Sequence, residues 1–103
     1  MNITNKNGQT VLHYAVIKHN IELANFLVTH GSDVNIKDKN GRTPLHIAVQ
    51  HNYKEFVEFL IMHCADLDIK DEYGKTALCI AIENNYNDIV SLLISCDNKI
   101  SRN

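Results

Sequence analysis

Residues 40–48 read NGRTPLHIA, and this stretch decides the fold. The same framework occurs at residues 7–15 (NGQTVLHYA) and at residues 73–81 (YGKTALCIA), and the step from the first copy to the second equals the step from the second to the third. A fixed period in this range is typical of stacked supersecondary units, none of which buries its apolar face alone. Residues that recur at this period are therefore expected to be structural, and functional residues are expected among the positions that change.

Each 33-residue unit predicts two short helices. The glycine of each copy supplies the positive φ that a turn tip demands, and the threonine two residues later is well placed as a helix N-cap. Pro44 occupies a first helical position, where its missing N–H costs nothing. We expect first helices at residues 11–18, 44–51 and 77–84, which end at His19, Asn52 and Asn85. Second helices are expected to run to about His30, His63 and Ser95.

These residues resemble the ankyrin repeat family across residues 5–96. Residues 38–46 (DKNGRTPLH) are similar to its pattern almost throughout, and residues 31–35 and 64–68 resemble the closing turn of its repeat. The third unit departs from the pattern, with Cys79 where histidine is usual and residues 97–101 where the closing turn should be. The resemblance implies an all-α solenoid of stacked helix-turn-helix units with projecting β-turns or hairpins. It also implies that His13 and His46 tie the turn to the first helix through hydrogen bonds.

The chain has 103 residues, which suits a single domain with repeats at 5–37, 38–70 and 71–103. Three repeats are about the minimum for a stable stack, so the chain is either a segment of a longer array or a complete small protein. The net charge of −2 gives no strong attraction to nucleic acid or membrane, and no apolar run is long enough to span a bilayer. Three cysteines, an odd number, suit a reducing compartment. We expect a soluble intracellular protein, cytoplasmic or nuclear.

The histidines and cysteines do not predict a metal centre or a catalytic site. Two repeat positions hold six of these nine residues: His13, His46 and Cys79 at one, and His30, His63 and Cys96 at the other. Because packed helices lie about 8–10 Å apart, such a column cannot place several ligands about 2 Å from one ion. All four glycines are used in turns, which leaves no phosphate-binding loop. We therefore expect no enzymatic activity, no cofactor and no small-molecule substrate.

The turns carry an excess of basic side chains. Residues 4–9, 37–42 and 70–75 contain six basic and three acidic residues, a net charge of +3, whereas the rest of the chain carries −5. Either the turns are ordinary solvated loops, or their charge steers the protein toward an acidic partner surface. The resemblance implies that turn tips and first helices line a concave surface. We interpret the chain as a scaffold for protein–protein interaction, with candidate contacts at Lys6, Asn7, Tyr14, Lys39, Asn40, Arg42, Gln50, His51, Tyr73, Lys75 and Glu83.

Two other functions stay open. The chain can be a structural spacer within a longer array, which predicts no partner of its own. Nucleic-acid binding is the other alternative, although it needs clustered basic residues, and acidic residues are interleaved with the basic ones here.

The resemblance also implies a modification. Asparagines in the closing turn of ankyrin repeats are substrates of an intracellular asparaginyl hydroxylase in animal cells, and Asn35 matches such a site. The alternative is that Asn35 forms a hydrogen bond across its own turn.

Overall fold

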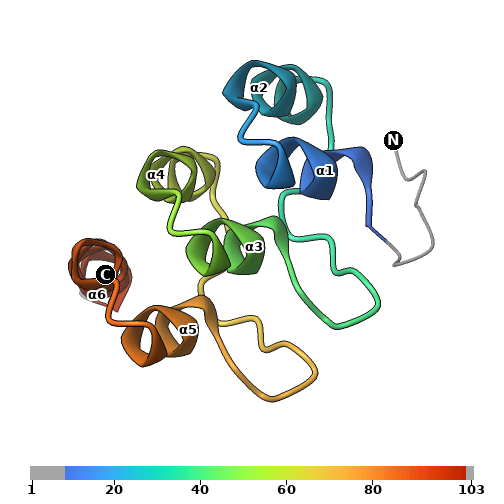
Figure 1. Cartoon of the computed structure of the whole chain (residues 1–103). Helices are drawn as coiled ribbons and strands as arrows, with labels where there is room; N and C mark the ends of the chain where they lie inside the picture. The colour runs from blue at the N-terminus through green and yellow to red at the C-terminus, as the bar shows by residue number, and fades with distance from the viewer. Residues whose placement is uncertain (1–8, 102–103) are drawn as a thin grey trace.

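The computed structural model describes the backbone of residues 9–101 and the surroundings of side chains 9–96. This part of the chain contains six α-helices: α1 (Val11–Ile17), α2 (Ile21–Thr29), α3 (Pro44–Gln50), α4 (Lys54–Met62), α5 (Ala77–Glu83) and α6 (Asn87–Ser101). The helices pair in chain order, and Figure 1 shows the three pairs stacked in one row. We call these pairs units one, two and three. The predicted all-α arrangement of helix-turn-helix units is confirmed.

The loops between the units project from one side of the row. Residues 30–43 and 63–76 form these loops, which extend from the layer that contains α1, α3 and α5 (Figure 1). We call these three the inner helices, and α2, α4 and α6 the outer helices. Each inner helix contacts the next, so the units form one continuous stack.

The core is built from positions that recur once in every unit. Ala15, Ala48 and Ala81 share one position, and each is completely buried. The position two residues after each N-cap threonine holds leucine, as in Leu45, which is 1% exposed. Close packing of identical positions explains why the framework residues hardly vary along the chain. These residues support the stack.

The inner helices begin at the predicted threonines. The hydroxyl oxygens of Thr10, Thr43 and Thr76 accept hydrogen bonds from backbone N–H groups three residues later. Pro44 is the first residue of α3, as expected. Asn20 caps α2, because its side-chain oxygen accepts from the N–H of Leu23 at 3.0 Å; the repeat pattern did not indicate this cap.

The inner helices end in the left-handed conformation, as the sequence predicts. His19, Asn52 and Asn85 have φ values of 55°, 58° and 60°. After the outer helices, Gly31 and Cys64 also have positive φ, at 96° and 67°. Cys64 thus adopts a conformation that usually favours glycine.

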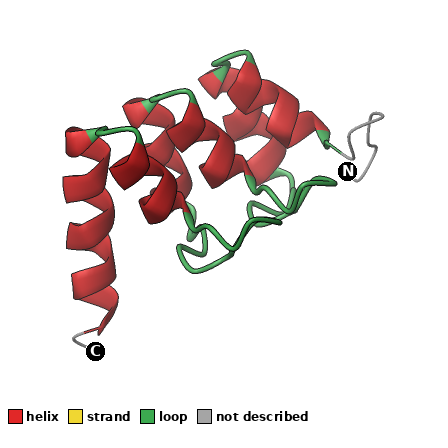
Figure 2. Ribbon diagram, turned by 60° about the horizontal axis from the view of Figure 1, so that its bottom comes forward, coloured by secondary structure: helices red, strands yellow, loops and turns green. Residues whose placement is uncertain are grey.

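The expected end of α6 at Ser95 is wrong, because the helix continues to Ser101. Units one and two leave their outer helices through Gly31 and Cys64, and the turn that follows Cys64 packs Ala65 into the core at 9% exposure. Unit three has Asp97 and Asn98 at the corresponding positions. Without a glycine or a small apolar residue there, helix propagation adds a hydrogen bond per residue and wins over the turn. Figure 2 shows α6 extending past the other outer helices.

No helix among residues 9–101 is long and apolar enough to cross a membrane. α6 is the longest of the described helices, with 15 residues.

Candidate protein-interaction groove

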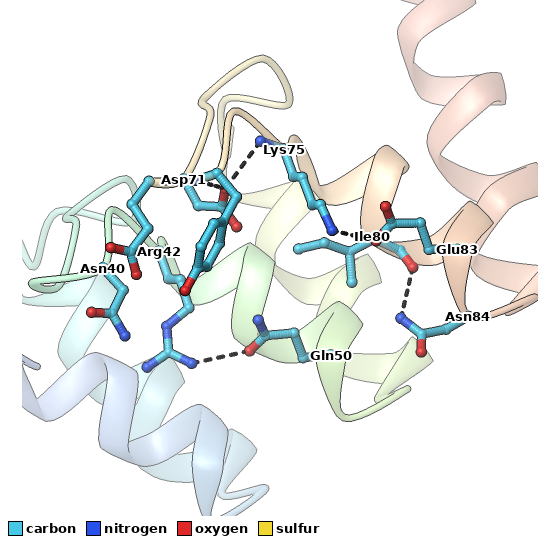
Figure 3. Close-up of a pocket in the computed structure, with 10 residues that line it drawn as sticks. Asn40, Arg42, Gln50, Asp71, Lys75, Ile80, Glu83 and Asn84 are labelled. Carbon is cyan, nitrogen blue, oxygen red and sulfur yellow. Dashed lines mark hydrogen bonds and ion pairs between the residues drawn. The ribbon is translucent and has the colours of Figure 1, made fainter.

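A groove opens between the turns of units two and three and the inner helices α3 and α5 (Figure 3). We call it the concave groove. Its walls carry charged, amide and aromatic side chains together with one aliphatic residue. The lining residues are Asn40, Arg42, Gln50, Asp71, Glu72, Tyr73, Lys75, Ile80, Glu83 and Asn84.

One wall of the groove is held rigidly by Arg42. Its Nε donates to Oδ2 of Asp38 at 2.9 Å, and its Nη1 donates to Oε1 of Gln50 at 3.3 Å. The Oδ1 atom of Asp38 accepts from the backbone N–H groups of Asn40 and Arg42, both at 2.9 Å. The Asp38 side chain is fully buried, and that of Arg42 is 25% exposed. These hydrogen bonds thus hold the guanidinium in one position.

Electrostatics keep Asp38 ionised. Burial by itself raises the pKa of this carboxyl, but the backbone N–H and the guanidinium of Arg42, together with the N–H of Asn40, bring the pKa below its usual 3.8. A buried carboxylate that accepts several hydrogen bonds favours its charged form. The Asp38–Arg42 pair therefore stays intact at neutral pH.

The opposite wall has a more exposed ion pair at the same repeat positions. Lys75 occupies the repeat position of Arg42, and Glu83 occupies that of Gln50. The Nζ atom of Lys75 lies 2.9 Å from Oε1 of Glu83, and this hydrogen bond raises the pKa of Lys75. Both side chains are well exposed, at 40% and 51%, so this ion pair contributes little and opens readily. The groove combines a fixed wall with an adaptable one.

Six of the eleven candidate contacts come together in the concave groove. They are Asn40, Arg42, Gln50, Tyr73, Lys75 and Glu83. Tyr73 is 76% exposed at its turn tip. Four lining residues are not among the candidate contacts predicted from the sequence: Asp71, Glu72, Ile80 and Asn84. Asp71 occupies the repeat position of Asp38, so the period itself carried the signal for that residue.

The other candidates lie elsewhere. Lys6 and Asn7 are outside the described residues. Lys39 is exposed but does not line the groove. His51 is exposed and stacks on Tyr53, with ring centroids 5.2 Å apart. Tyr14 is half exposed, at a position where the other two units are buried, so it faces the open end of the stack.

His13 and His46, which share one repeat position, have a structural role. Nδ1 of His13 accepts from the backbone N–H of Thr10 at 3.0 Å, and Nε2 lies 3.0 Å from the carbonyl oxygen of Arg42. His46 repeats this arrangement with Thr43 and Lys75. The expected link between turn and helix is confirmed, and it also reaches the turn of the following unit.

The side chain of Asn35 forms a hydrogen bond to the next unit and not across its own turn. Its Oδ1 accepts from the backbone N–H of Asp66 at 2.8 Å. Its own backbone N–H donates to Oδ1 of Asp33 at 2.9 Å. The side chain therefore joins successive closing turns.

Metal-binding groups are scattered in the described part of the chain. No cluster of three or more histidine, cysteine or acidic side chains among these residues has a geometry that could hold a metal ion. Cys79 stands apart from the groove lining, and hydrogen bonds that the hydroxyl and the backbone N–H of Thr76 donate to its sulfur lower the pKa of its thiol. The groove offers hydrogen bonds and charges suited to binding.

Comparison with known proteins accords with this architecture. The family model described as ankyrin repeats (3 copies) matches residues 1–71 and 30–103. No curated protein matches the chain. Ankyrin repeats are generally protein-binding modules and are typically not catalytic. With the match spanning the whole sequence and the helix pairs in register, the chain belongs to the ankyrin repeat family.

Proposed function

We propose that this protein is an interaction module that binds a protein partner through the concave groove and the adjoining turn tips. The observation that carries the proposal is the fixed position of Arg42. Its bonds to Asp38 and Gln50 engage two of its five N–H groups, which leaves donors available to a partner. A preorganised arginine loses little conformational entropy on binding, and arginine is enriched among binding hot spots.

Tyr73 supplies the second feature that supports binding. It is an exposed aromatic side chain at the rim of the groove. Tyrosine at a rigid surface contributes large contact area at a low entropic cost, which makes it a frequent interface anchor. Tyr73 and Arg42 thus offer an apolar and a polar contact on one surface.

We further propose that the partner presents an acidic surface toward the turn tips. Lys37, Lys39 and Lys70 are exposed, and no ion pair engages them within the described residues. Arg42 and Lys75, in contrast, are already paired with acidic side chains. The three free lysines are therefore the source of attraction, which acts mainly on the rate of association.

A photo-crosslinking experiment tests the proposed surface. Tyr73 is replaced by the photoreactive amino acid p-benzoylphenylalanine, and the protein is irradiated in a cell extract. A matched variant carries the same amino acid at Lys54, an exposed residue at the start of α4. We expect a crosslinked protein from position 73 and none from position 54. If position 73 gives no crosslink, the spacer alternative is favoured.

A fluorescence titration with a mixed-sequence oligonucleotide at low salt addresses nucleic-acid binding. The interaction-module proposal predicts no saturable binding. Saturable binding that weakens steeply with added salt would instead indicate phosphate contacts.

A further inference from the structure

The two ends of the stack expose apolar positions that are buried in the middle. At the end formed by unit one, Tyr14 is 50% exposed, whereas Ile47 and Ile80, at the same repeat position, are 1% and 5% exposed. A position that is exposed only in the first unit is a position that a preceding unit covers. Phe26 follows the same rule, since it is 51% exposed and its counterpart Phe59 is half-buried. Tyr14 and Phe26 define the N-terminal end face.

The end formed by unit three shows the opposite pattern. Ile82 is 54% exposed, whereas Val16 and Val49, at the same repeat position, are completely buried. Ile94 is 43% exposed, and its counterpart Ile61 is half-buried. A position that is exposed only in the last unit is one that a following unit covers. Ile82 and Ile94 define the C-terminal end face.

The two end faces are complementary halves of one interface. Inside the chain, each unit packs against the next. The positions equivalent to the C-terminal end face lie on one side of this junction, and the positions equivalent to the N-terminal end face lie on the other. The junction occurs twice, between units one and two and between units two and three. A second copy of this chain carries both halves, so it can continue the stack at either end.

We propose that two copies of this protein associate head to tail, with the C-terminal end face of one on the N-terminal end face of the other. The occupant follows from continuity with the internal junctions. Because the contact joins different surfaces, it leaves one free face at each end and permits further growth.

This junction lacks a hydrogen bond that the internal junctions have. His13 and His46 each reach a carbonyl oxygen of the following unit, whereas unit three has Cys79 at that position, and its side chain is exposed. The junction between copies is also not covalently linked. Association should therefore depend on protein concentration, with an affinity far below the stability of the internal junctions.

Sedimentation velocity measures the association, at concentrations up to about 1 mM, where even weak contacts are populated. For the unmodified chain we expect a weight-average mass that rises with concentration to more than twice the 11.7 kDa of one chain. Tyr14→Glu and Ile82→Glu should each remain monomeric, because each blocks one face. Met62→Glu is the control, since Met62 is 80% exposed and its counterparts Thr29 and Ser95 are exposed too.

Mixing the two blocked variants tests the head-to-tail arrangement. Tyr14→Glu retains an intact C-terminal end face and Ile82→Glu an intact N-terminal end face, so the equimolar mixture should form a dimer and nothing larger. Should either variant unfold, Phe26→Glu or Ile94→Glu replaces it on the same face. The proposal is overturned if the unmodified chain stays monomeric throughout, if Met62→Glu abolishes association, or if Tyr14→Glu alone still dimerises.

Discussion

Nε2 of His46 lies 2.9 Å from the carbonyl oxygen of Lys75, which is 29 residues further along the chain. Nδ1 of the same ring accepts from the backbone N–H of Thr43, so in the neutral imidazole Nε2 carries the proton and donates to Lys75. One side chain therefore fixes its own helix start and the turn of the next unit. Nε2 of His13 likewise contacts the carbonyl oxygen of Arg42, so these two histidines position the backbone of both groove walls.

Replacement of His46 should destabilise the stack. His46→Ala leaves the buried N–H of Thr43 without a partner, which costs about 1–3 kcal/mol, and it removes one of the two hydrogen bonds that the Lys75 carbonyl accepts, the other coming from the N–H of Asp71. Cys79→Ala is the matched control, because Cys79 has the same repeat position but is exposed. Urea denaturation should give a clearly lower midpoint for His46→Ala only. Equal midpoints for the two variants would contradict the role assigned to the histidine.

Stability should fall as the pH drops through the range where free histidine titrates. Burial lowers the pKa of His13 below its usual 6.5, and the hydrogen bond to the Arg42 carbonyl offsets this only in part. Below pH 6.5 the unfolded chain therefore binds a proton that the folded chain does not, so the stability that is present above this value is lost as the pH falls.

A comparison of urea midpoints at about pH 8 and about pH 5 measures this loss. His13→Gln should be less stable at the higher pH but should lose less on acidification. The Asp38 carboxyl does not interfere, because its pKa is lowered from 3.8 and its contribution is lost only below that value. An unchanged pH dependence in His13→Gln would exclude His13 as the source.

Two glycines at the same repeat position should respond differently to substitution. Gly41 and Gly74 have φ values of 75° and 74°, so alanine is strained at both by about 1–2 kcal/mol. A Cβ at Gly41 would also lie 3.0 Å from the backbone nitrogen of Glu72 and 3.1 Å from Cα of Asp71, whereas a Cβ at Gly74 meets nothing within 4 Å. Gly41→Ala should therefore melt at a lower temperature than Gly74→Ala.

The contact at Gly41 explains the difference. The N–H of Glu72 donates to the carbonyl of Asn40 at 2.9 Å, and this bond holds the two turn tips together. Equal melting temperatures for the two variants would show that the turns separate without cost.

Binding should depend on the turn tips, and Tyr73→Ala with Lys39→Glu is the variant that tests it. Both side chains are exposed, so the melting curve should change little. Loss of an aromatic anchor costs about 2 kcal/mol or more of binding free energy, which isothermal titration with the crosslinked partner would measure. Arg42→Glu is unsuitable, because it would place a second carboxylate against the buried Asp38.

Lys54→Glu serves as the control for the binding experiment. Lys54 is exposed at the start of α4, away from the residues that line the groove. It should leave the affinity unchanged. If Lys54→Glu weakened binding and the double variant did not, the interaction surface would lie on the outer helices.

Asn35 can be tested both as a joint and as a modification site. Asn35→Ala removes the acceptor for the Asp66 N–H and should cost about 0.5–1.5 kcal/mol, whereas Asn35→Asp keeps an acceptor and should cost less. Mass spectrometry of protein expressed in animal cells would detect hydroxylation as one added oxygen on the Asn35 peptide. An unmodified peptide would exclude Asn35 as a substrate under those conditions.

The sequence by itself determined the local structure of each unit. Thr43 caps a helix, Pro44 begins it and Asn52 ends it, and each of these roles depends on the backbone within a few residues. Because the sequence repeats, a correct assignment of the helix start in one unit applies to all three units. The repeat period predicted the wrong end for α6. It placed a turn after Ser95 as in the other two units, whereas the helix continues to Ser101.

Only the tertiary structure decided which polar residues act together. The pairing of Arg42 with Asp38 and Gln50 turns a seemingly free cation into a fixed and largely neutralised wall of the groove. The exposure of Tyr14 likewise follows from its place at the end of the stack, since the same repeat position is buried in the other two units. Burial at a repeat position depends on the packing of separate units, and the pairing of Arg42 depends on how its turn folds back against α3, so neither follows from the immediate neighbours of a residue along the chain.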